Sequence, residues 1–349
     1  MKPIEINGRG VGCGSPVYVV AEMSGNHNQD YDRAVEIIHQ AKQAGVDAIK
    51  LQTYTADTIT VDSDAEPFQV KGNLWDGYTL YSLYQEAYTP WEWQPKLKEV
   101  ADDVGLDLFS TPFDPTAIDF LEEMAVPAYK VASPELVDIP LIEQLAGLGK
   151  PIIMSTGMAT LAEVDDALCA MRGVDPDVSV ILLKCTAAYP APMDEMNLKT
   201  MPYLQQTFGV HVGLSDHTLG TDVAVAAAAL GACVIEKHFT LSRADGGPDA
   251  AFSLEPSEMK SLVDSVRNVE KALGEVVSGA SEHEVIGLKS RRSLFVVRDI
   301  EKGEELTRQN VRSIRPGQGL PPRYLQEILG KRARKALRAG TPLAWSSID

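Results

Sequence analysis

The chain has little of what marks membrane, secreted or disulfide-bonded proteins. No apolar run approaches the roughly 20 residues that a membrane helix needs, and the start, MKPIEINGRG, lacks the apolar core of a secretory signal. Only 4 cysteines occur in 349 residues, and none belongs to a CxxC pair. We therefore expect a cytoplasmic protein with reduced thiols, no membrane partner and no cysteine-based zinc or redox motif.

Short apolar runs alternate with helical patterns over most of the chain. Eight runs predict strands at 17–22, 48–52, 108–111, 128–131, 152–156, 178–184, 211–215 and 233–239. Helical patterns lie between and after them, among them 31–44, 90–104, 115–124, 139–148, 161–171, 222–230 and 256–273. A doubly wound nucleotide-binding fold would alternate too, but no GxGxxG follows the first strand. The pattern therefore favours a (β/α)8 TIM barrel.

One connection is much longer than the others. Residues 53–89 separate the second predicted strand from the next predicted barrel helix and are rich in tyrosine and tryptophan. Connections of this length are often lids or binding loops. Their aromatic side chains could cover a sugar, or could pack the insertion onto the barrel.

Past the barrel pattern, the sequence changes character near residues 274–288. Short strand patterns with Gly/Pro turns follow and predict a small β-rich module. We expect a catalytic barrel domain over 1–280, a linker over 281–292 and the second domain over 293–349.

The net charge of −17 is unevenly distributed. Residues 289–349 hold 14 basic and 6 acidic residues (+8), whereas the preceding 288 residues hold 18 basic and 43 acidic ones (−25). A basic module can bind nucleic acid, but here apolar and turn residues interrupt the basic ones. Docking of the module on an acidic body, within one chain or between subunits, is favoured instead, and we expect no nucleic-acid partner.

Polar side chains follow the predicted barrel strands at the end where barrel enzymes place their sites. His217 and His238 close neighbouring strands, with Asp216 and Glu236 beside them. A single histidine is more often a structural residue. Two imidazoles together are common ligands of a divalent ion such as Mn²⁺ or Zn²⁺ and leave positions open for catalysis, so the pair predicts a metal site.

Three lysines lie in apolar strands, a setting that lysine avoids unless it is paired. They are Lys50, Lys130 and Lys184. Pointing inward, they would combine with Ser133, Ser155 and Ser215 into a floor that binds phosphate or carboxylate. Strand alternation leaves open whether any one of them points inward or outward. A Schiff-base aldolase or lyase on Lys130 or Lys184 is the alternative use of such a lysine.

Nine motifs resemble, in order, those of the sialic acid synthase family. They are AEMSGNHNQD, DAIKLQTY, STPFD, YKVASPE, MSTGMAT, CTAAYPAP, GLSDHT, EKHFTL and GPDAAFS. The tail, with RDIEKGEELTRQNVRSIRPGQGL, resembles the family's antifreeze-like module, a SAF domain of the β-clip type. The match covers nearly the whole chain and implies a TIM barrel followed by that module.

The resemblance implies a transferase that condenses phosphoenolpyruvate with the open-chain aldehyde of an N-acetylated amino sugar. The products would be phosphate and a nine-carbon 2-keto acid. It also implies a divalent metal (Mn²⁺ or Mg²⁺, with Co²⁺ as a third option). Family members form domain-swapped homodimers, in which the antifreeze-like domain of one subunit caps the barrel of the other.

The family's functional residues carry over to matching motifs of this chain. His217 and His238 would hold the metal. The implied catalytic residues are Glu22, Lys50, Lys130, Glu236 and Arg315, with Glu22 as the acid/base or water-positioning group and Arg315 reaching the partner's site. The implied substrate-binding residues are Thr111, Ser133, Ser155, Lys184, Tyr189, Ser215 and Asp249. Of these, Thr111, Ser133, Ser155 and Ser215 would bind phosphoenolpyruvate with Lys50 and Lys130, and Tyr189 and Asp249 would contact the sugar.

Two features bear on the sugar. The insertion LWDGYTLYSLYQEAYTPWEW resembles that of the family's bacterial pseudaminic acid synthases, and Ala187 replaces an asparagine with which neuraminate synthases contact their sugar. The resemblance thus implies 2,4-diacetamido-2,4,6-trideoxyaltrose as the acceptor sugar. N-acetylneuraminate and legionaminate synthesis are alternatives. A binding protein on an inactive barrel, with the basic module holding nucleic acid or an anionic glycan, is the third hypothesis, which the presence of Glu22, Lys130, His217 and His238 disfavours.

Overall fold

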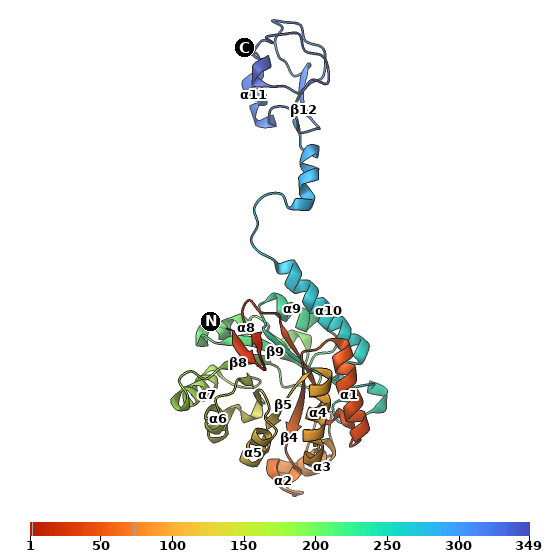
Figure 1. The fold of residues 1–349 in the computed structure, drawn as a ribbon, viewed down its shortest axis with the longest axis vertical. Helices are drawn as coiled ribbons and strands as arrows, with labels where there is room; N and C mark the ends of the chain where they lie inside the picture. The colour runs from red at the N-terminus through yellow and green to blue at the C-terminus, as the bar shows by residue number, and fades with distance from the viewer. Residues whose placement is uncertain (2, 73) are drawn as a thin grey trace. The chain divides into compact units, whose positions relative to one another are not determined.

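Eight parallel strands form a closed barrel in the computed structural model, which describes residues 1, 3–72 and 74–349 (Figure 1). They follow one another around the ring in chain order, and the last pairs with the first to close it. The strands are β3 Tyr18–Glu22, β4 Ala48–Thr53, β5 Asp107–Pro112, β6 Tyr129–Val131, β7 Ile152–Ser155, β8 Val180–Cys185, β9 His211–Asp216 and β10 Val234–His238. The barrel expected from the apolar runs is confirmed.

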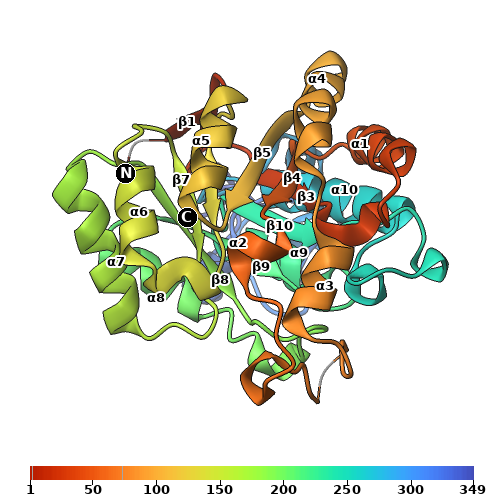
Figure 2. The ribbon, with the colours of Figure 1, turned by 90° about the horizontal axis from the view of Figure 1, so that it is seen from below.

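Helices surround the ring of strands (Figure 2). They are α1 Tyr31–Ala44, α4 Gln94–Val104, α5 Pro115–Glu123, α6 Ile139–Ala146, α7 Leu161–Val174, α8 Thr200–Phe208, α9 Asp222–Ala229 and α10 Pro256–Leu273. Asp30 begins α1 by accepting hydrogen bonds from two backbone N–H groups of the first turn, and Gly45 ends it with a left-handed backbone (φ 87°). Within the described residues, no helix combines the length and apolar character required to cross a membrane.

The strands lie between the barrel interior and the helices, so both their faces are buried. This explains the continuous apolar runs in the sequence. Gly213 in β9 shows how tightly the interior is filled, since a Cβ there would lie 2.3 Å from the Val234 carbonyl oxygen.

Among its described residues, the long connection after β4 contains two short α-helices with a largely irregular stretch between them. These are α2 Ala56–Ile59 and α3 Leu80–Ala87. Its far end is held by His27, which follows β3: the Nε2 atom lies 3.1 Å from the Thr89 hydroxyl, and Nδ1 accepts a bond from the Gln29 backbone N–H. Because burial lowers the pKa of His27 to about 4, the ring is neutral and Nε2 donates to Thr89.

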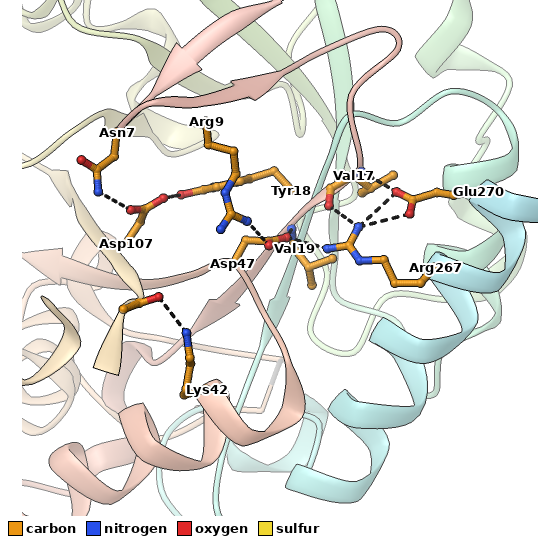
Figure 3. A network of polar contacts seen from close by, with 11 residues as sticks. Asn7, Arg9, Val17, Tyr18, Val19, Lys42, Asp47, Asp107, Arg267 and Glu270 are labelled. Carbon is orange, nitrogen blue, oxygen red and sulfur yellow. Dashed lines mark hydrogen bonds and ion pairs between the residues drawn. The ribbon is translucent and has the colours of Figure 1, made fainter. Parts of the chain in front are cut away.

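A hairpin that the sequence patterns did not indicate precedes the barrel. Its strands are β1 Ile4–Ile6 and β2 Arg9–Val11. The Asn7 amide donates to Asp107 over 2.6 Å and Arg9 pairs with Asp47, while the Tyr18 hydroxyl donates to Asp107 over 2.7 Å (Figure 3). These partners stand at the amino ends of β3, β4 and β5. The hairpin therefore lies at the end of the barrel opposite the predicted site.

The last barrel helix joins the same network (Figure 3). Arg267 of α10 donates to Asp47 over 2.8 Å and to the Val17 carbonyl oxygen over 2.7 Å. Residues some 220 positions apart are thus tied together at the point where the barrel closes.

The chain forms two compact units, Met1–Gly274 and Glu275–Asp349. In the second unit, β11 Ser293–Val296 pairs antiparallel with β12 Val311–Ile314, and α11 Leu325–Ile328 follows. A separate small core holds it together: Leu294, Val296, Ile300, Leu306, Val311, Ile328, Ala333, Leu337, Leu343 and Ile348. The β-rich module expected from its turns and short strands is thereby confirmed.

Candidate active site

A deep cavity at the carboxyl ends of the barrel strands collects most of the predicted site residues. Its lining includes Glu22, Lys50, Thr111, Lys130, Ser133, Ser155, Tyr189, Ser215, His217, Glu236 and His238. A second cavity, further out, shares Gln52, Phe113, Tyr189 and His238 with it and adds Asp249. We call the first the inner cavity and the second the outer cavity. The structure thus brings together residues from all eight barrel strands and the loops that follow them.

The floor of the inner cavity is a buried cluster of three charges. The Lys50 ammonium lies 2.6 Å from a carboxylate oxygen of Glu22 and 3.8 Å from one of Glu236, and it donates to the Thr111 hydroxyl over 3.3 Å. The three charged side chains are at most 7% exposed. Buried charges persist only when they are paired and hydrogen-bonded, so each of the three depends on the others.

The two carboxyl groups differ in acidity although they face the same lysine. Burial and the nearby Glu236 carboxylate raise the pKa of Glu22 to about 7. For Glu236, burial is outweighed by Lys50 and Lys130, and its pKa lies below the ordinary value. Glu236 is therefore a permanent carboxylate, whereas Glu22 can gain and lose a proton near neutral pH, as an acid/base group must.

Beside this cluster lies a set of donors suited to an anion. Lys130 donates to the Ser155 hydroxyl over 2.7 Å, and Ser133 accepts a bond from the Gly157 backbone N–H over 3.0 Å. Lys130 is fully buried, and burial lowers its pKa. An ammonium so placed is poorly hydrated, so it gains strongly from a bound phosphate or carboxylate.

The two predicted metal ligands face each other across the mouth of the inner cavity, with ring centroids 5.4 Å apart. His217 Nδ1 lies 3.0 Å from the Thr186 carbonyl oxygen. A carbonyl only accepts, so Nδ1 carries a proton, and in the neutral ring Nε2 holds the lone pair. The effect of burial on His217 is outweighed by Cys185 and the Thr186 carbonyl oxygen, so the pKa of this ring lies above its ordinary value. His238 Nδ1 is buried without a hydrogen-bond partner among the described residues, and Asp249 approaches it to 3.8 Å. Burial lowers the pKa of His238, which keeps this ring neutral.

His217 and His238 fit a divalent ion as two ligands and leave its other coordination positions open. In its neutral form each ring offers a nitrogen lone pair, and the Nδ1 atom of His238 and one oxygen of Glu236 lack hydrogen-bond partners in the part of the chain described. No group of three or more His, Cys, Asp or Glu side chains among the described residues is arranged to hold a metal. An ion here would complete its coordination with water and substrate oxygens, as a catalytic ion does.

One predicted site residue of the barrel unit, Lys184, lines neither cavity. The Lys184 ammonium turns back to its own strand end, donating to the Cys185 carbonyl oxygen and the Thr186 hydroxyl. Its neighbour Cys185 lines the inner cavity instead. Arg315 belongs to the second unit.

Gln52 is a site residue that the prediction left out. Its amide nitrogen donates to Glu22 over 2.8 Å and to the Ser24 hydroxyl over 2.9 Å. It therefore orients the carboxyl group whose pKa is raised. Its position two residues after Lys50 on the same strand, and so on the same face, was the available signal.

Asp216, expected beside the metal, pairs with Lys237 in the barrel wall. The two side chains are fully buried and 2.7 Å apart. Lys237 also donates to the Thr218 carbonyl oxygen, and Asp216 accepts from the Thr218 backbone N–H and hydroxyl. This pair therefore holds the segment that carries His217 and fixes where its ring can point.

A closed barrel with a lysine- and serine-lined floor and a pair of imidazoles defines an enzyme that acts on a small anionic substrate. Residues 37–278 match the NeuB family and residues 291–349 match the SAF domain. The chain belongs to the NeuB family. This confirms the resemblance to sialic acid synthases drawn from the motifs.

Relatives of known name agree with this assignment. The chain is 45% identical to a pseudaminic acid synthase of Helicobacter pylori, over 96% of this chain and 98% of the relative. It is 37% identical to an N,N'-diacetyllegionaminic acid synthase of Legionella pneumophila, over 97% and 96%. A crystal structure of N-acetylneuraminic acid synthetase from Leptospira borgpetersenii in complex with citrate superposes with a TM-score of 0.73 at 28% identity, covering 82% of this chain and 95% of that one.

Removing one partner of the Asp216–Lys237 pair should destabilise the barrel strongly. In Lys237→Ala, the Asp216 carboxylate would stay buried without a counter-charge, at a cost of about 3–5 kcal/mol in the free energy of unfolding. Urea unfolding followed by circular dichroism measures it. The matched control is Lys260→Ala, whose pair with Asp264 is exposed on both sides, with an expected change of about 0.5 kcal/mol or less. Equal small losses in both variants would contradict the structural role of the pair.

Proposed function

We propose that this protein is a pseudaminic acid synthase. It condenses phosphoenolpyruvate with the open-chain aldehyde of 2,4-diacetamido-2,4,6-trideoxyaltrose and water, giving a nine-carbon 2-keto acid and phosphate. The single observation that carries the proposal is the inner cavity, where two buried lysines and several hydroxyl groups meet a carboxyl group titrating near neutral pH. The 45% identity to a relative of that name, over nearly the full length of both chains, supports the choice of sugar.

In this proposal phosphoenolpyruvate occupies the floor of the inner cavity. Lys130 and Ser155 bind one of its anionic groups, with Ser133 and Thr111 completing the contacts. Lys50, which lies between Glu22 and Glu236, contributes a second positive charge to the phosphoenolpyruvate site. Fixed cations in a water-poor site hold the enol ester in one orientation and stabilise the charge that develops as the phosphate leaves.

The reaction needs one group that can both give and take a proton. A bond forms between the third carbon of phosphoenolpyruvate and the aldehyde carbon, whose oxygen takes a proton. Water adds to the second carbon and loses a proton. The bond from that carbon to the phosphate oxygen then breaks, the new hydroxyl group gives up its proton, and the 2-keto group and phosphate result. Glu22, with its pKa raised to about 7 and its orientation set by Gln52, is suited to these transfers.

His217 and His238 would hold a divalent ion, Mn²⁺ or Mg²⁺. When bound, such an ion polarises the aldehyde oxygen. The two imidazole rings that line the inner cavity with centroids 5.4 Å apart, and the His217 Nδ1 atom turned to the Thr186 carbonyl oxygen, support this assignment. Tyr189 packs on His217 with ring centroids 4.4 Å apart and would limit the freedom of that ring and of the sugar beside it.

We further propose a homodimer in which the second unit of one subunit caps the barrel of the other. The charges of +8 on residues 289–349 and −25 on the rest of the chain support such docking. In this arrangement Arg315 would bind an oxygen of the substrate in the partner's site through its planar guanidinium.

The substrate assignment is tested by offering phosphoenolpyruvate with a panel of hexosamines and measuring phosphate release and product mass. We expect turnover with the diacetamido-trideoxy sugar and little with N-acetylmannosamine. Turnover with N-acetylmannosamine alone would contradict the choice of sugar while leaving the family intact. A covalent adduct trapped by borohydride, without phosphate release, would instead favour Schiff-base chemistry on a lysine.

The metal assignment predicts loss of activity when either ligand is removed. Since loss of a group that only orients a ligand already costs about 10–100-fold, His217→Ala and His238→Ala should each lower phosphate release by about 100-fold or more. Chelation should abolish it, and Mn²⁺, Mg²⁺ or Co²⁺ should restore it. Mn²⁺ binding measured by calorimetry provides an independent readout, and His39→Ala on α1 is the matched control. Full activity after exhaustive chelation would refute a metal.

The cap can be tested by mixing two inactive variants. Arg315→Ala and His217→Ala should each be inactive, whereas co-expression should give about a quarter of the wild-type activity, because half of the dimers are mixed and each holds one intact site. Activity no higher than that of the separate variants would show that the arginine acts within its own chain or not at all.

A further inference from the structure

The outer cavity has two chemically different walls. One wall is polar and carries Ser24, Gln52, His238 and Asp249; the other carries Tyr54, Leu83, Tyr84, Ala87 and Phe113. Tyr54 meets Tyr84 and Phe113 edge to face, with ring centroids 5.5 and 5.2 Å apart. We call the second set the aromatic wall. Three of its members come from α3, so the insertion after β4 builds much of it.

The aromatic wall is held in place rather than free to adapt. The Gln29 amide donates to the Tyr88 carbonyl oxygen over 2.6 Å at the end of α3. The Trp75 indole N–H donates to the Pro248 carbonyl oxygen over 2.8 Å. Both ends of the segment that carries α3 are therefore anchored to loops at the carboxyl end of the barrel, and the wall is preformed before a ligand arrives.

The position of the wall decides which part of a sugar it meets. The reacting aldehyde must reach the inner cavity, where Lys50 and the two histidines lie. The outer cavity continues from there through Gln52, Tyr189 and His238, which line both cavities. A six-carbon sugar with its first carbon at the inner cavity therefore extends its fourth to sixth carbons along the aromatic wall.

We propose that the aromatic wall determines specificity by packing against a sugar whose far end is deoxygenated and N-acylated. This inference rests on the proposed function and names the residues that choose its sugar. A methyl group at carbon 6 and the methyl of an acetamido group at carbon 4 bury apolar area against Tyr84 and Leu83. A hydroxyl group packed against the Leu83 side chain or the ring face of Tyr84 would lose its water without gaining a hydrogen-bond partner there.

The proposal is tested by comparing two sugars that differ at one carbon, the diacetamido-trideoxy sugar and its counterpart with a hydroxyl group on carbon 6. The wild-type kcat/KM should favour the first by about 100-fold, the discrimination that an apolar pocket reaches against an added hydroxyl group. Tyr84→Ala should lower kcat/KM for the 6-deoxy sugar and reduce the preference toward unity, with the KM for phosphoenolpyruvate unchanged. Tyr84→Phe should retain the preference.

Tyr81→Ala is the matched control. It removes the same side chain from the same helix three residues earlier, where Tyr81 bonds to Asp57 and lines neither cavity. Ala87→Ser adds a single hydroxyl group to the wall without removing bulk and should shift the preference in the same direction, so the test stands even if Tyr84→Ala unfolds. An unchanged sugar preference in both wall variants would overturn the inference. Absence of phosphate release from any N-acylated sugar with the wild type would instead overturn the proposed function.

Discussion

The active-site cavity depends on one ammonium group shared by two buried carboxyl groups. Glu22, Lys50 and Glu236 stand on three neighbouring strands, β3, β4 and β10. None of the three could remain charged out of water alone, so the barrel must bring them within a few ångströms of one another. Because β10 reaches β3 only when the ring closes, closing the ring assembles the cluster. The same strand pairing that closes the barrel therefore also assembles the charged cluster of the active-site cavity.

The same cluster shows how one barrel floor gives two carboxyl groups different properties. Glu236 faces both buried lysines and stays ionised, whereas Glu22 faces one lysine and the other carboxylate. Around them the site passes from charged floor to imidazole mouth to aromatic wall. In the proposed reaction these layers would meet, in turn, the anion, the reacting aldehyde and the remote end of the sugar.

The sequence predicted the barrel well because the strands are buried on both faces. The run at 178–184 became β8 Val180–Cys185, and the other seven strands also lie within two residues of their predicted ends. Boundaries depended on capping and turn geometry that apolar patterns do not encode. The helix expected from residue 90, for example, begins at Gln94 after a 3-10 turn. The β1–β2 hairpin was missed because strands of 3 residues carry no clear alternation.

The sequence predicted that residues at the ends of strands belong to the site. It did not predict which of two neighbouring residues on a strand faces the barrel interior. Lys184 and Cys185 are neighbours at the end of β8, and only the three-dimensional structure shows that the cysteine faces the inner cavity. The sequence likewise placed Asp216 beside the two histidines of the predicted metal site. In the structure, Asp216 pairs with Lys237 in the barrel wall. Successive residues of a strand point to opposite faces, so a shift of one residue exchanges the two sets of side chains. A continuous apolar run does not show which set points inward.

The network between the first hairpin, Asp47 and Arg267 has a consequence for biosynthesis. As the polypeptide leaves the ribosome, β3 emerges early but has β4 as its only neighbour until β10 has been translated. The edge of β3 that later pairs with β10 stays unpaired while roughly 200 further residues are synthesised. Arg267, which ties α10 to Asp47, is synthesised after β10. A truncated nascent chain therefore cannot display the completed floor, and catalytic competence appears only when the barrel is nearly whole.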